Sequence, residues 1–284
     1  MTTETQTPPG AGSRSRRILL LAVVAALVLV IGVVVWWLSR DDAPEAASLE
    51  AATAEITDDA DDGEAGTDAA DDDGADAATD DADAGADSGS DDATAGSAGG
   101  IDGTWTVDTS VGEFSFQDST GTFVGFRVGE ELQAVGEIEA VGRTPGVSGT
   151  IDIDGTTVTA VSIEADMAAL TTDDSRRDNR VQGALETDQF PTATFVLTSP
   201  IEFGEGAANG DPVSASASGD LTVHGVTQPV TFDLEAQLVD DTVVVVGSTE
   251  ITFADYGVTV PSAPIVLSAN DFGTIELQLF LVRS

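Results

Sequence analysis

The stretch GDLTVHGVTQPVTFDLEAQL, residues 219–238, decides how this chain folds. In its second half, apolar residues occupy every second position and polar residues occupy the positions between them. Because side chains alternate faces along a strand, this half predicts a strand with one dry face and one wet face. A tight turn is expected at His224-Gly225, since glycine accepts a positive φ. The expected inward set is Val230, Phe232, Leu234, Ala236 and Leu238.

The same alternation recurs through residues 101–284, with Gly, Pro, Asn and Asp between the segments. All eleven Phe of the chain lie in this part, which locates the hydrophobic core there. Residues 172–185 differ, because they have helical character with Thr172 or Asp173 as N-cap. The pattern therefore predicts an all-β fold, an antiparallel β-barrel with one short helix. The expected strands are 103–108, 113–117, 122–128, 135–141, 147–152, 157–166, 193–197, 214–223, 230–239, 242–253 and 273–282.

A different pattern precedes this domain. Residues 18–38 are 21 uncharged, apolar residues, which as a helix would span roughly 31 Å, close to the thickness of a bilayer core. Three Arg precede them within the polar tail 1–17, and Asp41 and Asp42 follow, so the N-terminus is expected inside and the rest outside. A cleaved signal peptide is the alternative, but its apolar region is usually shorter. We expect a single-pass anchor in the cytoplasmic membrane with an extracytoplasmic C-terminal domain.

Residues 41–100 are low-complexity Ala, Asp, Gly, Ser and Thr, with 21 acidic residues and no basic one. Such a composition buries too little apolar surface to offset chain entropy, so a disordered acidic linker is expected. An inert spacer is the simplest role, and cation or cell-wall binding is the alternative. The formal net charge of −41 and the absence of Lys argue against nucleic acid as a partner, since phosphate binding needs clustered basic residues.

Residues 103–284 resemble the YceI-like proteins, a lipocalin-like group of bacterial polyisoprenoid-binding proteins. The resemblance rests on Trp105 and Asp108, on RD at 177–178, on FPTATF at 190–195, on GDLTVHGVTQPV at 219–230 and on DFG at 271–273. It implies an extended lipocalin-like barrel whose interior holds an isoprenoid chain, and an exported location. One departure is that Asn179 follows Asp178 where the family often has His. Contacts that relied on such an imidazole are therefore in doubt.

An interior large enough for a lipid needs apolar lining. An eight-stranded barrel can be filled by its own side chains or leave room for one ligand, and both alternatives remain open from the residues alone. The family resemblance favours a cavity. The expected lipid-binding residues are Phe114, Phe116, Phe123, Phe126, Val230, Phe232, Leu234, Leu277 and Leu279.

Three arginines lie within five residues of the expected helix: Arg176, Arg177 and Arg180. Together they could clamp an anionic head group at the barrel mouth. The competing interpretation is local ion pairing, with Arg177 opposite Asp173 one turn earlier.

Other chemistry finds little support. His224 is the only His and there is no Cys, so a turn residue is favoured over a zinc ligand. Asp152, Asp154 and Gly155 favour a hairpin turn, because the calcium-loop spacing fails at Val161. Catalytic motifs such as G-x-S-x-G, H-E-x-x-H and G-x-x-x-x-G-K do not occur.

The sequence thus predicts a non-catalytic protein, without a cofactor, that binds an isoprenoid or similar amphiphile inside a membrane-tethered barrel. The alternative is a surface interaction or stress protein with a filled barrel and no lipid. A hydrolase or isomerase is the least favoured hypothesis, and the sequence does not indicate an oligomeric state.

Overall fold

The computed structural model describes residues 43–61, 100–133, 135–261 and 263–284. The expected anchor at 18–38 and most of the expected linker lie outside these ranges. Within them, no helix is long and apolar enough to cross a membrane.

The described secondary structure consists mainly of strands. The helices are α2 (Leu49–Asp61) and α3 (Ser175–Ala184), with short 3₁₀ turns η1 (Glu205–Asn209) and η2 (Phe253–Tyr256). The strands are β1 (Gly103–Val107), β2 (Phe123–Leu132), β3 (Gly136–Thr144), β4 (Val147–Asp154), β5 (Thr157–Asp166), β6 (Thr171–Thr172), β7 (Thr192–Leu197), β8 (Ile201–Glu202), β9 (Val213–Val223), β10 (Val226–Val239), β11 (Thr242–Thr252), β12 (Val266–Ala269) and β13 (Phe272–Arg283).

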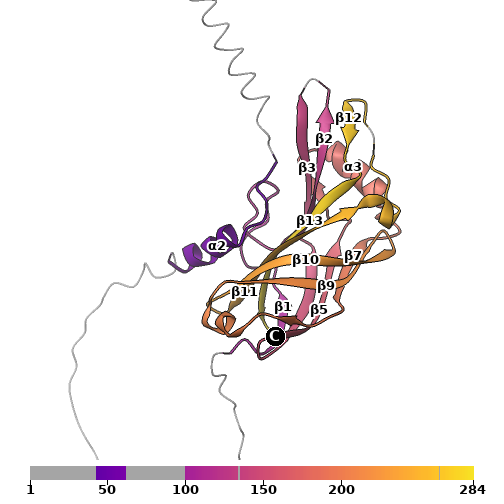
Figure 1. Cartoon of the computed structure of the whole chain (residues 1–284). Coiled ribbons are helices and arrows are strands. Elements are labelled where there is room, and N and C mark those ends of the chain that lie inside the picture. Colours follow the sequence, from indigo (N-terminus) through magenta and orange to yellow (C-terminus); the bar gives the residue numbers. More distant parts are fainter. Residues whose placement is uncertain (1–42, 62–99, 134, 262) are drawn as a thin grey trace, which may run out of the picture.

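The strands form one antiparallel sheet that closes on itself (Figure 1). Among the described residues, the closed ring has eight strands, in the order β1-β4-β5-β7-β9-β10-β11-β13, and β13 returns to pair with β1. This confirms the expected all-β antiparallel barrel with one short helix in the domain.

The barrel is extended at one end. The last residues of β13 pair with β1, whereas its segment 274–278 pairs with β2, which continues into β3 and β6. Strand β12 pairs with the far half of β2. Here α3, expected at 172–185, lies beside β6 and contributes side chains to the interior. The extension therefore lengthens the barrel beyond its closed ring.

The hairpin that decides the fold has the expected form. Strands β9 and β10 pair continuously from Val223 opposite Val226 to Val213 opposite Ala236. His224 and Gly225 both have positive φ, 52° and 71°, as a two-residue turn of the primed type requires. Phe232 is buried, whereas Thr231 and Asp233 are exposed, so the predicted dry and wet faces are correct.

One glycine of this hairpin is required by packing. A Cβ on Gly219 would lie 2.4 Å from the Phe195 ring, closer than two carbon atoms can approach. The Phe195 ring packs instead at 5.3 Å, edge to face, against the Phe232 ring. Gly219 therefore lets an aromatic pair form inside the barrel.

One expected strand is wrong. Residues 113–117 alternate in polarity but lie in a loop, and Val111 of the same loop packs on the outer face of the barrel. The loop is fixed by side chains: Thr122 Oγ1 donates to the carbonyl of Asp108, and Gln278 Nε2 donates to the carbonyl of Gly121 at 2.9 Å. The outer face needs this cover because Phe123 and Phe280 point outward and are almost fully buried.

A second cover comes from residues 43–61, which we call the strap. It falls within the range expected to be a disordered linker, yet the segment 43–48 and α2 lie on the outer face of the barrel (Figure 1). Leu49 and Ala52 pack against Val244, Val246 and Phe280. These three barrel residues point outward, because their neighbours Val245, Leu279 and Leu281 belong to the interior cluster.

The strap is also held by a buried charge network on the outer face. Glu276 accepts from Arg127 Nε at 2.8 Å and from Arg143 Nε at 2.9 Å, and all three side chains are at most 9% exposed. The carbonyls of Pro44 and Glu45 accept from Nη2 of Arg127 and Nη2 of Arg143, respectively. Burying a charged group without hydrogen-bond partners costs free energy. The strap carbonyls therefore supply acceptors for Arg127 and Arg143 that the barrel does not supply.

Burial and pairing act in opposite directions on the two arginines. Burial alone would lower the pKa of Arg127, but hydrogen bonding and charge from Glu276 raise it above its ordinary value. Burial lowers the pKa of Arg143, and Glu276 offsets that only in part. The Glu276 carboxylate thus pairs with both guanidinium groups. Glu139, which is more exposed, forms a second ion pair with Arg127.

Candidate ligand cavity

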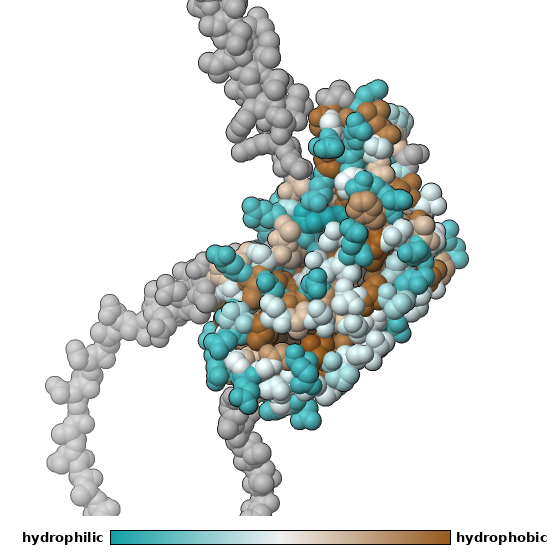
Figure 2. All heavy atoms as spheres, viewed as in Figure 1, coloured by the Kyte–Doolittle hydropathy of each residue, from teal (hydrophilic) through white to brown (hydrophobic). Residues whose placement is uncertain are grey.

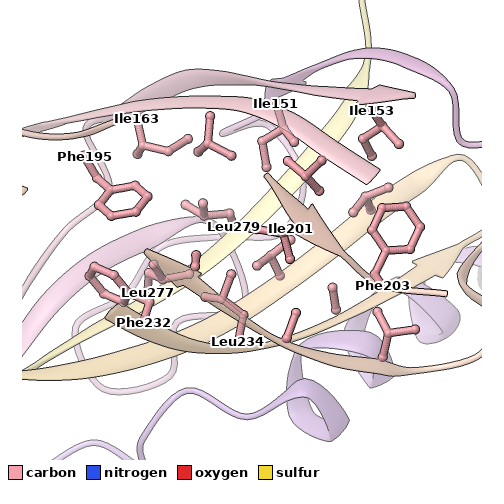
Figure 3. A pocket seen from close by; sticks show the side chains of 18 of the residues that line it. Ile151, Ile153, Ile163, Phe195, Ile201, Phe203, Phe232, Leu234, Leu277 and Leu279 are labelled. Carbon is pink, nitrogen blue, oxygen red and sulfur yellow. The ribbon is translucent and has the colours of Figure 1, made fainter. Parts of the chain in front are cut away.

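The ring of strands encloses an apolar cavity of about 160 Å³, which we call chamber 1. Its walls come from β4, β5, β7, β9, β10, β11 and β13, so strands far apart in sequence face a common space. Figure 3 shows side chains of opposite walls pointing toward one another. The labelled lining residues are Ile151, Ile153, Ile163, Phe195, Ile201, Phe203, Phe232, Leu234, Leu277 and Leu279.

Many of these inward side chains are not fully buried. Phe195, Leu234 and Leu277 keep intermediate exposure although they face the interior. In a barrel filled by its own side chains, such positions would be close-packed, as protein cores are. The packing therefore fits a hollow interior rather than a filled one.

A second cavity of about 210 Å³, chamber 2, lies in the extended end of the barrel. The two chambers share the lining residues Val124, Ala193, Leu221 and Ile275, so they meet at a common waist. Chamber 2 differs in carrying polar groups, with Glu130, Asp174, Arg177 and Arg180 in its lining. The interior thus runs from an almost wholly apolar end to a partly charged one.

Helix α3 and its N-cap place three of the four charged groups of chamber 2, and the fourth, Glu130, lies on β2. Asp174 is its N-cap and accepts from the backbone N–H of Arg176 at 2.7 Å, which holds the pKa of that carboxyl below its usual range. Thr172 or Asp173 was the expected cap. Thr172 instead donates its backbone N–H and hydroxyl to Asp178 at 2.6 and 2.7 Å. Asp178 is therefore a structural residue that fastens the helix to β6.

The three predicted arginines separate into different roles. Arg177 pairs with Asp173, as expected, and lies 3.6 Å from Glu130, so local ion pairing is confirmed for it. Arg180 lines chamber 2 and takes part in no ion pair among the described residues. Arg176 is exposed and lines neither chamber.

The structure brings together five of the nine residues expected to line the cavity. Phe232, Leu234, Leu277 and Leu279 line chamber 1, and Phe126 lines chamber 2. Val230 packs in the adjoining core without lining either chamber.

The remaining three phenylalanines do not face the interior. Phe123 points outward, where the Arg143 guanidinium lies 4.3 Å from its ring centre. Phe114 and Phe116 lie on the covering loop rather than on a strand, and neither lines a chamber. Their alternation resembled an inward strand because this loop alternates exposed and half-buried residues, as a strand does.

The wall of chamber 1 formed by β5 and β7 was not predicted from the sequence. Ile163 and Ala165 share a face of β5, which matches the predicted strand 157–166 at both ends, and Phe195 faces them from β7. Their alternation was visible in the sequence and could have supplied this wall. Residues such as Ala193 and Ala215 carry no such signal, since small side chains line a chamber only because of where the fold puts them.

His224 connects elements beside chamber 2. Its Nδ1 lies 3.1 Å from the carbonyl oxygen of Tyr256, so Nδ1–H donates there, and Nε2 lies 3.5 Å from a carboxylate oxygen of Glu186. Phe190 packs edge to face on the ring at 4.9 Å. Burial raises the pKa of Tyr256, a chamber 2 residue, to about 12. The hairpin-turn prediction for His224 is confirmed, and its contacts brace the wall of chamber 2.

Comparison with curated proteins gives partial matches. A UPF0312 protein of Pseudomonas putida is 36% identical over 74 residues, which are 25% of this chain and 35% of that protein. Protein YceI of Shigella flexneri is 32% identical over 121 residues, 41% of this chain and 56% of that protein. The matched regions therefore span from about a third to somewhat more than half of these relatives.

Comparison with solved structures finds a polyisoprenoid-binding domain from Saccharophagus degradans. It has 16% identity and a TM-score of 0.47, over 64% of this chain and 99% of that one. Burkholderia cenocepacia BcnA has 19% identity and a TM-score of 0.42 over 56% and 95%. The sequence profile of the YceI-like domain matches residues 105–280, which is more than half of the chain. This chain therefore belongs to the YceI-like family.

Proposed function

We propose that this protein is a non-catalytic carrier that holds the hydrocarbon part of an isoprenoid or similar amphiphile in its two chambers. The observation that carries the proposal is the shared waist, because Val124, Ala193, Leu221 and Ile275 line both chambers. A long flexible chain can occupy both spaces at once. Its binding would come largely from apolar burial, at about 25 cal/mol per Å².

The polarity of the cavity favours one orientation of the ligand. Chamber 1 is lined almost wholly by apolar side chains, which suits a hydrocarbon tail. Chamber 2 carries Arg177 and Arg180, which could accept an anionic head group, as guanidinium groups do for phosphates. Arg180 is the stronger candidate, since Arg177 is engaged by Asp173. The polar end of the ligand would therefore lie at α3.

The membrane tether belongs to the same proposal. The 21 uncharged residues 18–38, with arginines before them and aspartates after them, support a single-pass helix with the barrel outside the cytoplasmic membrane. A carrier of a membrane-soluble ligand would then be retained beside the membrane that contains that ligand.

The test uses the full chain in mild detergent, titrated with a fluorescent polyprenol and with the corresponding polyprenyl phosphate. Both should bind, the phosphate more tightly. Arg180→Gln should weaken phosphate binding about tenfold, the order expected for a lost charged hydrogen bond, and leave polyprenol binding unchanged. Arg176→Gln is the matched control and should change neither. Absence of binding of both probes would overturn the proposal, and equal effects of the two substitutions would overturn the head-group assignment.

A further inference from the structure

Exposed apolar side chains gather at the end of the barrel that contains chamber 2. Val135, in the turn between β2 and β3, is 54% exposed, and Ile265 and Leu267 are each 59% exposed. We call these three residues the rim patch. Figure 2 shows apolar surface at this end, beside the β2–β3 hairpin and β12. Large apolar side chains exposed together mark a site of contact with another surface.

The rim patch is continuous with the cavity. Ile265 is both exposed and part of the lining of chamber 2. The segment that leads to it contributes Val258, Val260 and Pro261 to the same lining, and the carbonyl of Ile265 accepts from the backbone N–H of Gln133 at 2.7 Å. An apolar surface therefore runs from outside the barrel into the chamber.

The strap determines how far the barrel can lie from the proposed anchor. The carbonyl of Pro44 is hydrogen-bonded to Arg127, which fixes Pro44 on the barrel. Only five residues lie between Pro44 and Leu38, the last residue of the proposed helix. Six extended residue steps span at most about 20–22 Å. Without the strap, the linker would extend through residue 100 and reach much farther. With the proposed anchor in the bilayer, strap docking would hold the barrel close to the membrane.

The geometry also selects which end of the barrel faces the membrane. Arg127 is five residues from Leu132 at the tip of β2, about 17 Å along the strand. The short tether therefore reaches as far as the rim patch. The opposite end is more distant. Thr274 pairs with Arg127, and Arg283 is nine residues further along β13, about 30 Å.

We propose that the rim patch rests on the outer surface of the bilayer, so that a lipid passes between the bilayer and chamber 2 without crossing water. The inference rests on the proposed anchor and carrier function, and it adds the docking surface and the entry route. Its partner is a lipid surface, since the patch joins a lipid-sized apolar cavity and the tether places it there.

Charge determines which bilayer suits this surface. Glu131 and Glu137 are exposed on either side of the β2–β3 turn. Carboxylates are repelled by anionic head groups and resist burial, so the contact should be shallow and should favour zwitterionic lipid. Anionic lipid should weaken the contact at low salt, and added salt should restore it.

The natural chain has no Cys, so single cysteines can be labelled cleanly. The full chain is reconstituted into phosphatidylcholine vesicles with an environment-sensitive fluorophore at Leu267→Cys, and in a second variant at Val135→Cys. Neither residue lines a chamber. The controls are Val196→Cys, an exposed apolar site on β7, and Asp154→Cys at the far end. Nitroxide-labelled lipid should quench both rim labels at least threefold more than either control.

Equal quenching at rim and control sites would overturn the docking proposal. It would leave the carrier function standing if polyprenol still binds. Strong rim quenching without polyprenol binding would overturn the carrier function and the entry route, and would leave only the docking surface. A chain that fails to float with the vesicles would overturn the anchor and this inference with it. Replacing both Leu267 and Val135 by Ser should slow polyprenol exchange with vesicles several-fold while leaving polyprenol affinity in detergent unchanged. Unchanged exchange would contradict the entry route.

Discussion

Ala236 lies on β10 and lines chamber 1, which makes Ala236→Phe a test of whether the barrel is hollow. The added ring brings on the order of 100 Å² of apolar surface, worth roughly 2–3 kcal/mol when buried at about 25 cal/mol per Å². Lost rotamer freedom costs about 0.5–1 kcal/mol. Chamber 1 has about 160 Å³ to receive the ring. The variant should therefore be about 1–2 kcal/mol more stable to unfolding than the natural chain.

The assay is urea denaturation of the delipidated full chain, combined with polyprenol titration. Filling the chamber should raise the free energy of unfolding and lower polyprenol affinity at least tenfold. Ala160→Phe is the control, because Ala160 is exposed on the outside of β5 and should leave polyprenol affinity unchanged. In a filled barrel, Ala236→Phe would overpack the core and destabilise it by about 1–3 kcal/mol. A destabilised variant that keeps its polyprenol affinity would refute the hollow-barrel reasoning.

Three further predictions concern the fold, each measured by chemical denaturation. Glu276→Ala should lower the free energy of unfolding by about 3–5 kcal/mol, because it leaves two buried guanidinium groups without their shared carboxylate. Glu139→Ala, at a more exposed partner of Arg127, should lower it by less than about 1 kcal/mol. Equal losses of stability in the two variants would contradict the buried network. Gly219→Ala should lower the free energy of unfolding by about 1–3 kcal/mol, because the added methyl group would clash with the Phe195 ring. Gly183→Ala has open space around it and should stabilise α3. An unchanged stability of Gly219→Ala would contradict the close packing of Phe195 on Gly219. Asp174→Ala should lower the denaturation midpoint at pH 7. The folded state lowers the pKa of Asp174, so the ionised carboxylate contributes to stability above the unfolded-state pKa of about 3.9. This contribution disappears as the pH falls through the folded-state pKa. At that pH the denaturation midpoints of the variant and the natural chain should converge. A difference that persists in acid would exclude the charged cap as its cause.

Local patterns predicted most of the barrel. The hairpin at 219–238 has the expected inward face and turn, and strand 157–166 matches β5 at both ends. These predictions succeed because period-two burial and a positive-φ turn are properties of neighbouring residues. They need no knowledge of which other strands lie beside them.

The outer covers could not be predicted in the same way. A run of four valines at 243–246 has apolar residues on both faces of β11, which indicates burial on both sides, but not by which segment. The strap supplies that cover from almost 200 residues earlier in the chain, through Leu49 and Ala52. Its acidic, Ala-rich composition predicted disorder because intrinsic propensity does not include a distant apolar surface.

In the candidate ligand cavity too, local sequence patterns predicted some residues, whereas others depend on contacts between distant segments. Phe126, Phe232 and Leu277 were identified by residue type and alternation. Phe114 and Phe116 were misplaced because a loop with alternately exposed and half-buried residues shows the same alternation. The waist between the chambers depends on how strands from distant parts of the sequence approach one another. Only the closed sheet shows it.

Native mass spectrometry of the full chain released from mild detergent, followed by lipid extraction, tests whether the two chambers hold one amphiphile. We predict a bound species at one molecule per chain that extraction identifies as an isoprenoid or similar amphiphile. It should be absent from Ala236→Phe and present in Ala160→Phe. A chain that carries no such species, even after incubation with polyprenol, would contradict the account.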